Sequence, residues 1–201
     1  HRDYSMLGRV RVEINSEGML ISNPGGFIEG INADNLLDAE PHGRNPVLAD
    51  ALKRIGLAER TGRGIDRIYE GSLLYGRLLP DYSRSTSTSV RLFIPRGMPD
   101  RAFVRMISEE QQRLGHPLPI YALLVLNTLK QMHQAALREI AEALKRDESR
   151  IKAVVEALVE SGLVEAIGNG RGRNYMLIPK AYGRENTAAY IRQKGIDELR
   201  Y

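Results

Sequence analysis

Three helix-forming segments and a hairpin follow one another in the second half of the chain, and this order limits the fold more than any other feature. Apolar residues recur at helical spacing in all three segments. The helical segments are residues 120–132, 137–144 and 148–161, and the hairpin strands are residues 163–167 and 174–178. Two helices joined by a three-residue turn and followed by a hairpin predict a winged helix-turn-helix domain.

The residues predicted to bind DNA lie in this turn, at the start of the third helix and around the hairpin tip. A helix fits the major groove and presents the side chains of its first turns to base edges. The glycine-rich tip, residues 168–172, lets the backbone approach a phosphate closely, and arginines neutralise the phosphate charge. The predicted DNA-binding residues are Lys145, Arg146, Ser149, Arg150, Lys152, Arg171, Arg173 and Asn174.

The positive charge of the chain is concentrated in the same half. Residues 1–100 contain 13 Lys and Arg against 13 Asp and Glu, and residues 101–201 contain 16 against 12, so the net charge of +4 belongs to the second half. A basic domain attracts polyanions such as DNA. A solvated surface of mixed charge is the alternative, and Glu148 beside Arg150 weakens a phosphate clamp. Winged helices also serve as protein-interaction or dimerisation modules, so a homo-oligomer stays open.

The segment ALREIAEALKRDESRIKAVVEALVESGLVEAIGNGRGRNYMLI, residues 136–178, resembles the winged helices of bacterial transcriptional regulators of the MarR and DeoR groups. The resemblance implies the order regulator helix, recognition helix, strand and wing. Asp147 is expected to cap the recognition helix through its side chain. The likeness is specific for the fold and less specific for what the domain binds.

The first half mixes strands and helices, so the predicted fold class is α+β. Alternation of Val10, Val12 and Ile14 with charged residues predicts a half-buried strand in a hairpin that turns at residues 15–18. Helices are predicted from Pro46 to Gly56 and from Gly64 to Gly76, followed by a strand over residues 89–94. Residues 95–99 are rich in proline and mark a domain boundary, after which residues 102–114 form a helix.

Residues 1–96 also resemble a known family. The motifs HRDYS, ISNPGGF, RNPVLADALKRIGLAERTGRGIDRIY and VRLFIP are similar to those of the ATPase-like domain of prokaryotic proteins described as RecG-related helicases or transcriptional regulators. The resemblance implies a divergent member of the GHKL superfamily, which includes histidine kinases, gyrase B, Hsp90 and MutL. It implies that residues 1–98 are the C-terminal part of a GHKL-like α/β sandwich whose N-terminal part is missing here. In that group one or more winged helices follow the domain, as they are predicted to do here.

The GHKL resemblance implies a nucleotide site with departures from the usual pattern. Ser22 stands where the adenine-binding aspartate would be, and the asparagine helix that holds Mg²⁺ would lie before His1. ATP with Mg²⁺ is therefore an expectation for a longer protein rather than for these 201 residues. The predicted nucleotide-binding residues are Asn23, Gly25, Gly26, Arg44, Asn45, Gly62 and Gly64. The alternative is structural, with the glycines in turns and Asn45 as the cap of a helix.

Other chemistry is not indicated. The chain has no cysteine, no apolar run long enough to span a membrane and no P-loop motif, and its four histidines have no metal-binding spacing. We expect a cytoplasmic protein without a metal, a catalytic residue or a membrane partner. The predicted domains are residues 1–98, ATPase-like; 99–183, winged helix; and 184–201, a helix that begins a further segment.

The sequence thus predicts a transcriptional regulator in which an ATPase-like domain with a sensory or assembly role precedes a winged helix that binds double-stranded DNA. The alternatives are an ATP-dependent enzyme that acts on DNA and a nucleotide-switched assembly module. Both require that the ATPase-like domain binds a nucleotide.

Overall fold

The structure is a computed structural model in which residues 2–40, 42–57 and 62–178 are described, apart from the side chain of Arg171. The chain divides into two compact units, His1–Asp100 and Arg101–Tyr201, which are called unit 1 and unit 2 below. Each unit combines helices with an antiparallel three-stranded sheet, so the predicted α+β class is confirmed. The helix predicted over residues 186–201 lies outside the described residues.

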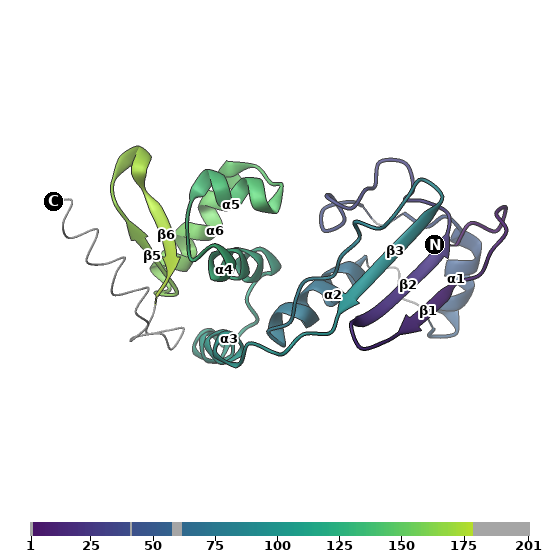
Figure 1. Cartoon of the computed structure of the whole chain (residues 1–201), viewed down its shortest axis with the longest axis horizontal. Coiled ribbons are helices and arrows are strands. Elements are labelled where there is room, and N and C mark those ends of the chain that lie inside the picture. Colours follow the sequence, from purple (N-terminus) through teal and green to yellow (C-terminus); the bar gives the residue numbers. More distant parts are fainter. Residues whose placement is uncertain (1, 41, 58–61, 179–201) are drawn as a thin grey trace. The chain divides into compact units, whose positions relative to one another are not determined.

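Unit 1 is built on a sheet with the strand order β1-β2-β3 (Figure 1). Its strands are β1 (Arg11–Ile14), β2 (Gly18–Pro24) and β3 (Ser89–Pro95). The predicted hairpin joins β1 to β2, and the side-chain oxygen Oδ1 of Asn15 accepts hydrogen bonds from the backbone N–H groups of Glu17 and Gly18 at 2.9 and 3.1 Å. Asparagine favours such turns because its side chain can replace a backbone acceptor.

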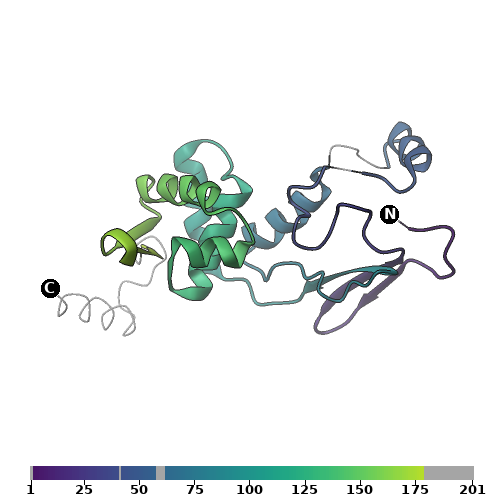
Figure 2. The same ribbon diagram turned by 90° about the horizontal axis from the view of Figure 1, so that it is seen from above.

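The two helices of unit 1 are α1 (Pro46–Arg54) and α2 (Arg63–Leu74). Pro46 begins α1, where its missing N–H costs nothing. Leu73 of α2 is fully buried and forms the small core of the unit with Tyr82 and Leu92. By contrast, α1 buries no residue and stands apart from the sheet in Figure 2.

Strand β1 differs from its prediction. All four of its residues are exposed, and the side chains of Val12 and Ile14 are 56% and 77% exposed. The alternating pattern correctly predicted a strand, but a strand is half-buried only if another element covers one of its faces, and no described residue covers β1. The expected half-buried strand is therefore wrong in its burial.

Unit 2 has the element order helix, helix, strand, helix, helix, strand, strand. Its elements are α3 (Arg101–Leu114), α4 (Ile120–Met132), β4 (Gln134–Ala136), α5 (Leu137–Leu144), α6 (Glu148–Glu160), β5 (Val164–Ile167), the short 3₁₀ turn η1 (Gly170–Gly172) and β6 (Asn174–Leu177). The sheet order is β4-β6-β5, so β6 lies between the other two strands. This is the predicted winged helix-turn-helix, with one additional short strand, β4.

Helix α4 is the centre of unit 2. Its residues Tyr121–Leu129 are all buried, as expected for a helix that is apolar on every side. Leu126, Ile140 and Ile151 are fully buried and come from α4, α5 and α6, so the three helices share one core. This core fixes the orientation in which α5, the turn after it and α6 are presented to solvent.

Helix α3 also has a buried face, formed by Phe103, Met106 and Ile107. Glu110 on the same face is only 5% exposed, and its carboxylate accepts two hydrogen bonds from the Arg113 guanidinium at 2.7 and 2.6 Å. Within residues 2–40, 42–57 and 62–178, none of the helices combines the length and the apolar character that a membrane span requires.

Candidate DNA-binding surface and candidate nucleotide site

The turn between α5 and α6 is short and basic. Helix α5 ends at Leu144, and Lys145 then takes the left-handed conformation with φ 53° and ψ 48°. The N–H of Arg146 donates to the carbonyl of Ala141 at 3.0 Å, so the chain reverses directly after the helix. Lys145 is exposed and Arg146 is partly exposed. The turn therefore places two predicted DNA-binding residues at the beginning of α6.

Helix α6 directs its polar side chains away from the core. Ser149, Arg150 and Lys152 are exposed in its first turns, whereas Ile151 between them is fully buried. The Nζ of Lys152 lies 3.8 Å from a carboxylate oxygen of Glu156 one turn further on. The first turns of α6 thus have the exposure that a recognition helix requires.

Asp147 precedes α6 at its N-cap position, but its side chain makes no capping hydrogen bond. The prediction that this carboxylate caps the helix is therefore wrong. The backbone carbonyl of Asp147 accepts from the N–H groups of Arg150 and Ile151 at 3.1 and 3.2 Å, which starts the helical hydrogen bonding without the side chain.

Sequence reasoning missed Tyr121, whose side chain contacts one arginine in the turn between α5 and α6 and another in the first turn of α6. Tyr121 lies in the first turn of α4 and is 9% exposed. Its hydroxyl accepts a hydrogen bond from the Nε of Arg146 at 2.9 Å, and the Cζ of Arg150 lies 4.1 Å from the centre of its ring. The available signal was a tyrosine at the start of a strongly apolar helix, because a buried tyrosine hydroxyl usually has a hydrogen-bond partner.

The hairpin tip, residues 168–173, is called the wing. It contains the 3₁₀ turn η1, and Gly168 has φ +78°, which glycine adopts without strain. Arg173 is exposed, with its Cζ 5.6 Å from the centre of the Tyr175 ring. Asn174 begins β6, and its Nδ2 donates to the carbonyl of Gly172 at 3.1 Å. The side chain of Arg171 lies outside the described part of the chain.

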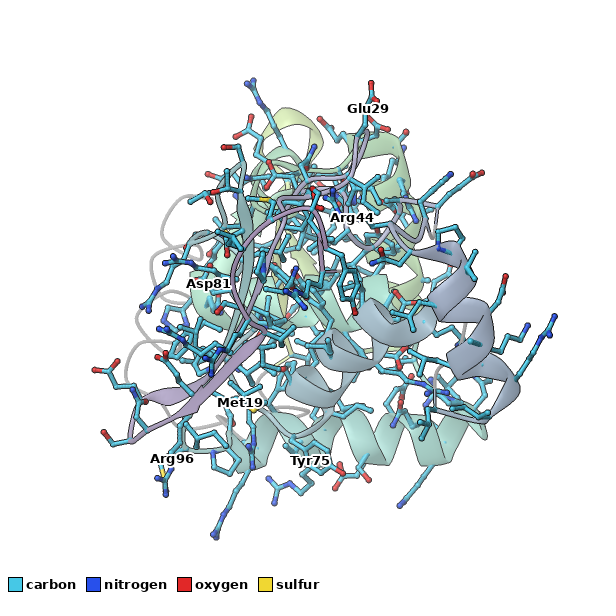
Figure 3. All side chains as sticks on the ribbon, turned by 90° about the vertical axis from the view of Figure 1, so that its right-hand side faces the viewer. Met19, Glu29, Arg44, Tyr75, Asp81 and Arg96 are labelled. Carbon is cyan, nitrogen blue, oxygen red and sulfur yellow. The ribbon has the colours of Figure 1, made fainter. Side chains whose placement is uncertain are left out.

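In unit 1, the end of β2 and the segment before α1 meet around Arg44. Its Nη1 donates to an oxygen of Asp3 at 3.0 Å and its Nη2 donates to the carbonyl of Gly26 at 2.8 Å. Figure 3 shows Arg44 among the other side chains of unit 1, whereas Glu29 points outward into solvent. The structure therefore brings Gly26 and Arg44 together, and it adds Asp3, which sequence reasoning did not single out.

The charge of Asp3 is stabilised locally. Its carboxylate accepts hydrogen bonds from the hydroxyl and the N–H of Ser5 at 2.6 and 3.0 Å. These two bonds, together with the nearby positive charge of Arg44, hold the pKa of Asp3 below its ordinary value of 3.8 despite an opposing effect of burial. Asp3 is therefore an anionic anchor for Arg44 at neutral pH.

The glycines at the end of β2 make close contacts within the protein. A Cβ at Gly25 would lie 2.7 Å from the Cβ of Asp3, and a Cβ at Gly26 would collide with the carbonyl oxygen of Ser87. The N–H of Gly25 donates to the carbonyl of Thr88 at 2.9 Å. The N–H of Gly25 and two nitrogens of the Arg44 guanidinium thus bind protein atoms, whereas the buried Nε of Arg44 has no hydrogen-bond partner among the described residues.

The other predicted nucleotide-binding residues are distributed over three elements. Asn23 lies in β2, and its backbone carbonyl accepts from the hydroxyl of Ser89 at 3.1 Å. Gly62 is the left-handed N-cap of α2, with φ +72°, and Gly64 is exposed in the first turn of that helix. Asn45 occupies the N-cap position of α1, but its Nδ2 donates to the carbonyl of Arg2 at 2.7 Å and does not cap the helix.

The alternative in which the Asn45 side chain caps α1 is therefore wrong, and this side chain instead ties the start of α1 to the beginning of the chain. For all seven residues the nucleotide assignment stays a prediction. In the described part of the chain, no group of three or more His, Asp or Glu residues is arranged to hold a metal ion.

Two family models match the chain. Residues 8–94 match the family described as "Putative ATP-dependent DNA helicase recG C-terminal", and residues 122–178 match a family described only as HVO_A0114. The first match confirms the predicted resemblance of unit 1 to a RecG-related ATPase-type domain. No curated protein matches the chain.

Solved structures are similar to the chain as well. The crystal structure of the DIP2311 protein from Corynebacterium diphtheriae is 22% identical over 92% of this chain and 39% of its own, with a TM-score of 0.69. The winged helix-turn-helix DNA-binding domain of Mb0332 from Mycobacterium bovis is 26% identical over 51% of this chain and 91% of its own, with a TM-score of 0.32. The first likeness shows a shared fold across both units, and the chain spans less than half the length of DIP2311.

Proposed function

We propose that this protein binds double-stranded DNA through unit 2 and acts as a transcriptional regulator, with the ATPase-like unit 1 in a sensory or assembly role. The observation that carries the proposal is the exposed, basic surface formed by the turn before α6 and the first turns of α6, where Lys145, Arg150 and Lys152 are exposed to solvent. A helix-turn-helix of this kind inserts the start of its second helix into the major groove.

The wing supports the same function. Its backbone at residues 168–172 contains three glycines, and the exposed Arg173 follows directly. Glycines permit a close approach to the DNA backbone, and arginine binds phosphate oxygens through several N–H groups. The wing would therefore position the domain on DNA, and the start of α6 would enter the major groove, where its side chains can reach base edges and the flanking phosphates.

Fluorescence anisotropy with a labelled duplex of about 30 base pairs at several salt concentrations tests the proposal. The logarithm of the affinity should fall linearly with the logarithm of the salt concentration. Replacing Arg150 or Arg173 by alanine should reduce the affinity by about 10-fold, and loss of a phosphate contact should reduce the salt slope by about 1. Arg105→Ala is the matched control, because Arg105 is exposed on α3 and outside the proposed surface.

Three results would count against DNA binding by this surface. Absence of binding at low salt would remove the function itself. Binding that does not depend on salt would show that phosphate contacts are not involved. An equal loss of affinity in Arg105→Ala and Arg150→Ala would mean that net charge, rather than the helix-turn-helix, attracts the DNA.

Nucleotide binding by unit 1 is the second candidate, and the family match over residues 8–94 favours it. The internal hydrogen bonds of Gly25 and Arg44 count against it in the conformation described. Thermal unfolding with and without Mg-ATP tests whether unit 1 binds the nucleotide, because a ligand that binds the folded state raises the Tm. Arg44→Ala should abolish such a rise if Arg44 contacts the nucleotide, and an unchanged Tm of the wild type would exclude this candidate for these 201 residues.

A further inference from the structure

We propose that Tyr121 is a positioning residue for DNA binding, which holds Arg146 and Arg150 as a pair directed at the phosphates of the DNA backbone. The inference rests on the proposed function of unit 2 and adds a residue that lies in a different helix from the predicted DNA-binding residues. It follows from the contacts that one buried aromatic side chain makes with two basic side chains.

Tyr121 contacts the two arginines in different ways. Its hydroxyl accepts a hydrogen bond from the Nε of Arg146 at 2.9 Å, while its ring lies beneath the guanidinium of Arg150 with 4.1 Å from the ring centre to Cζ. The Cζ of Arg146 is also within 5.8 Å of the ring centre. One side chain therefore fixes a residue of the turn and a residue of the recognition helix relative to each other.

Arg146 is also held from the other side. Its Nη1 donates to the carbonyl of Lys145 at 2.8 Å and lies 3.4 Å from the carbonyl of Leu144, at the C-terminal end of α5. Carbonyls at a helix end carry partial negative charge and attract a guanidinium. Arg146 is thus positioned by α4 and α5 together, and less conformational entropy remains to be lost when it meets a ligand.

A tyrosine suits this role better than a carboxylate. Glu110 and Glu142 bind Arg113 and Arg138 through ion pairs, which cancel charge. A tyrosine hydroxyl is uncharged at neutral pH, so its hydrogen bond and the cation–π contact of its ring orient a guanidinium without themselves cancelling its charge.

The position of Tyr121 makes the arrangement rigid. Tyr121 lies in the first turn of α4, whose residues 121–129 are all buried, so its ring is fixed by the core of unit 2. Arg150 is exposed and lies in the first turn of α6, where a recognition helix meets the DNA. The core of the domain therefore determines the direction of a side chain on its surface.

A double-mutant cycle on the full chain tests the proposal, with a labelled duplex of about 30 base pairs of random sequence as the probe, because phosphate contacts do not depend on sequence. Tyr121→Leu removes the ring and the hydroxyl and should weaken binding by about 10-fold. In the Arg150→Ala background the same substitution should weaken binding by only about 3-fold, the part that comes from the hydrogen bond to Arg146, since Tyr121 then has no Arg150 to position.

Tyr121→Phe is the conservative partner of this variant. It keeps the ring beneath Arg150 and removes only the hydrogen bond to Arg146, so binding should weaken by about 3-fold, and this loss should vanish in the Arg146→Ala background. If Tyr121→Leu does not fold, as judged by circular dichroism, the phenylalanine variant decides alone.

The outcomes separate this inference from the proposed function. Equal losses on substituting Tyr121 with and without Arg150 or Arg146 would show a structural role and overturn the inference, as would wild-type affinity in folded Tyr121 variants. In both cases, weaker DNA binding by Arg150→Ala than by the wild type would still support the proposal that unit 2 binds DNA. Absence of any DNA binding by the wild-type chain would overturn both.

Discussion

The two units differ in how far their helices are buried. In unit 2, α4 buries every residue from Tyr121 to Leu129. In unit 1, α1 buries none, and its Val47 and the following Ile55 are 82% and 67% exposed. Both segments contain good helix formers, so helix propensity does not explain the difference. The difference in burial indicates that unit 2 is stabilised by its own core, whereas α1 adds little to the stability of unit 1.

The largest expected effect is on the core of unit 2. Leu126 is fully buried, and Leu126→Ala should lower the free energy of unfolding by about 2–5 kcal/mol through lost contacts and the cavity that remains. Leu48→Ala is the same chemical change in α1, at a residue that is 41% exposed, and it should cost less than about 1 kcal/mol. Urea unfolding of the full chain, followed by circular dichroism, measures both.

This pair of variants can contradict the difference in burial between α1 and α4. If Leu48→Ala were as destabilising as Leu126→Ala, α1 would be covered in solution by a second copy or another partner. The apolar residues of α1 would then form an interface rather than a solvent-exposed face.

The next effect sharpens the comparison within unit 1. Gly26→Ala should destabilise the unit by about 1–3 kcal/mol, because the new Cβ would collide with the Ser87 carbonyl and the backbone would have to move. Gly64→Ala should have the opposite sign and stabilise by about 0.4–1 kcal/mol, since Gly64 lies in α2 and a Cβ added there would meet no described atom within 4 Å. Calorimetric Tm values of the two variants show whether the end of β2 is the rigid part of unit 1; a destabilised Gly64→Ala would contradict this.

Much of the fold of unit 2 could be predicted because its signals are local. The bounds predicted for the helices at residues 120–132 and 137–144 are those of α4 and α5. The apolar spacing and the short turn between α5 and α6 depend only on neighbouring residues. Strand β4 could not be predicted, because its three residues form a strand only by pairing with β6, which lies about 40 residues further along the chain.

The candidate sites depend on contacts between distant residues, and the sequence therefore predicted them less completely. Asn45 and Asp147 were placed correctly at helix N-termini, but neither side chain caps its helix. Asn45 binds the carbonyl of Arg2, which is distant in sequence. The contact of Tyr121 with Arg146 likewise joins residues 25 positions apart. A sequence pattern indicates which residue types are present, but the pairing is decided by packing.

A smaller effect concerns the core of unit 1 at high pH. Burial, and secondarily the neighbouring Tyr69, raises the pKa of Tyr82 from 10.0 to about 12. Because the folded-state pKa is raised, the protonated Tyr82 hydroxyl contributes fully to the free energy of unfolding below pH 10, and this contribution is lost as the pH rises towards 12. At about pH 11 the loss should be on the order of 1 kcal/mol. Urea midpoints of the wild type and Tyr82→Phe between neutral pH and pH 11 measure it, and the phenylalanine variant should lose less stability over this range. Parallel curves would show that the Tyr82 hydroxyl is not protected by the core.

The smallest expected effect concerns Asp3, and it tests whether the charge of this residue stabilises unit 1 in addition to the buried core. The folded state favours the charged form, because the pKa of Asp3 lies below 3.8 through its bonds to Ser5 and the charge of Arg44. The contribution of Asp3 is therefore present above pH 3.8 and is lost as the pH falls through the folded-state pKa. Asp3→Asn should have a lower unfolding midpoint than the wild type at neutral pH, and the difference should shrink below pH 3.8. Glu29→Gln, at an exposed carboxylate, is the control at neutral pH and should leave the midpoint unchanged. A constant offset in Asp3→Asn over the whole pH range would mean that the charge of Asp3 contributes nothing to stability.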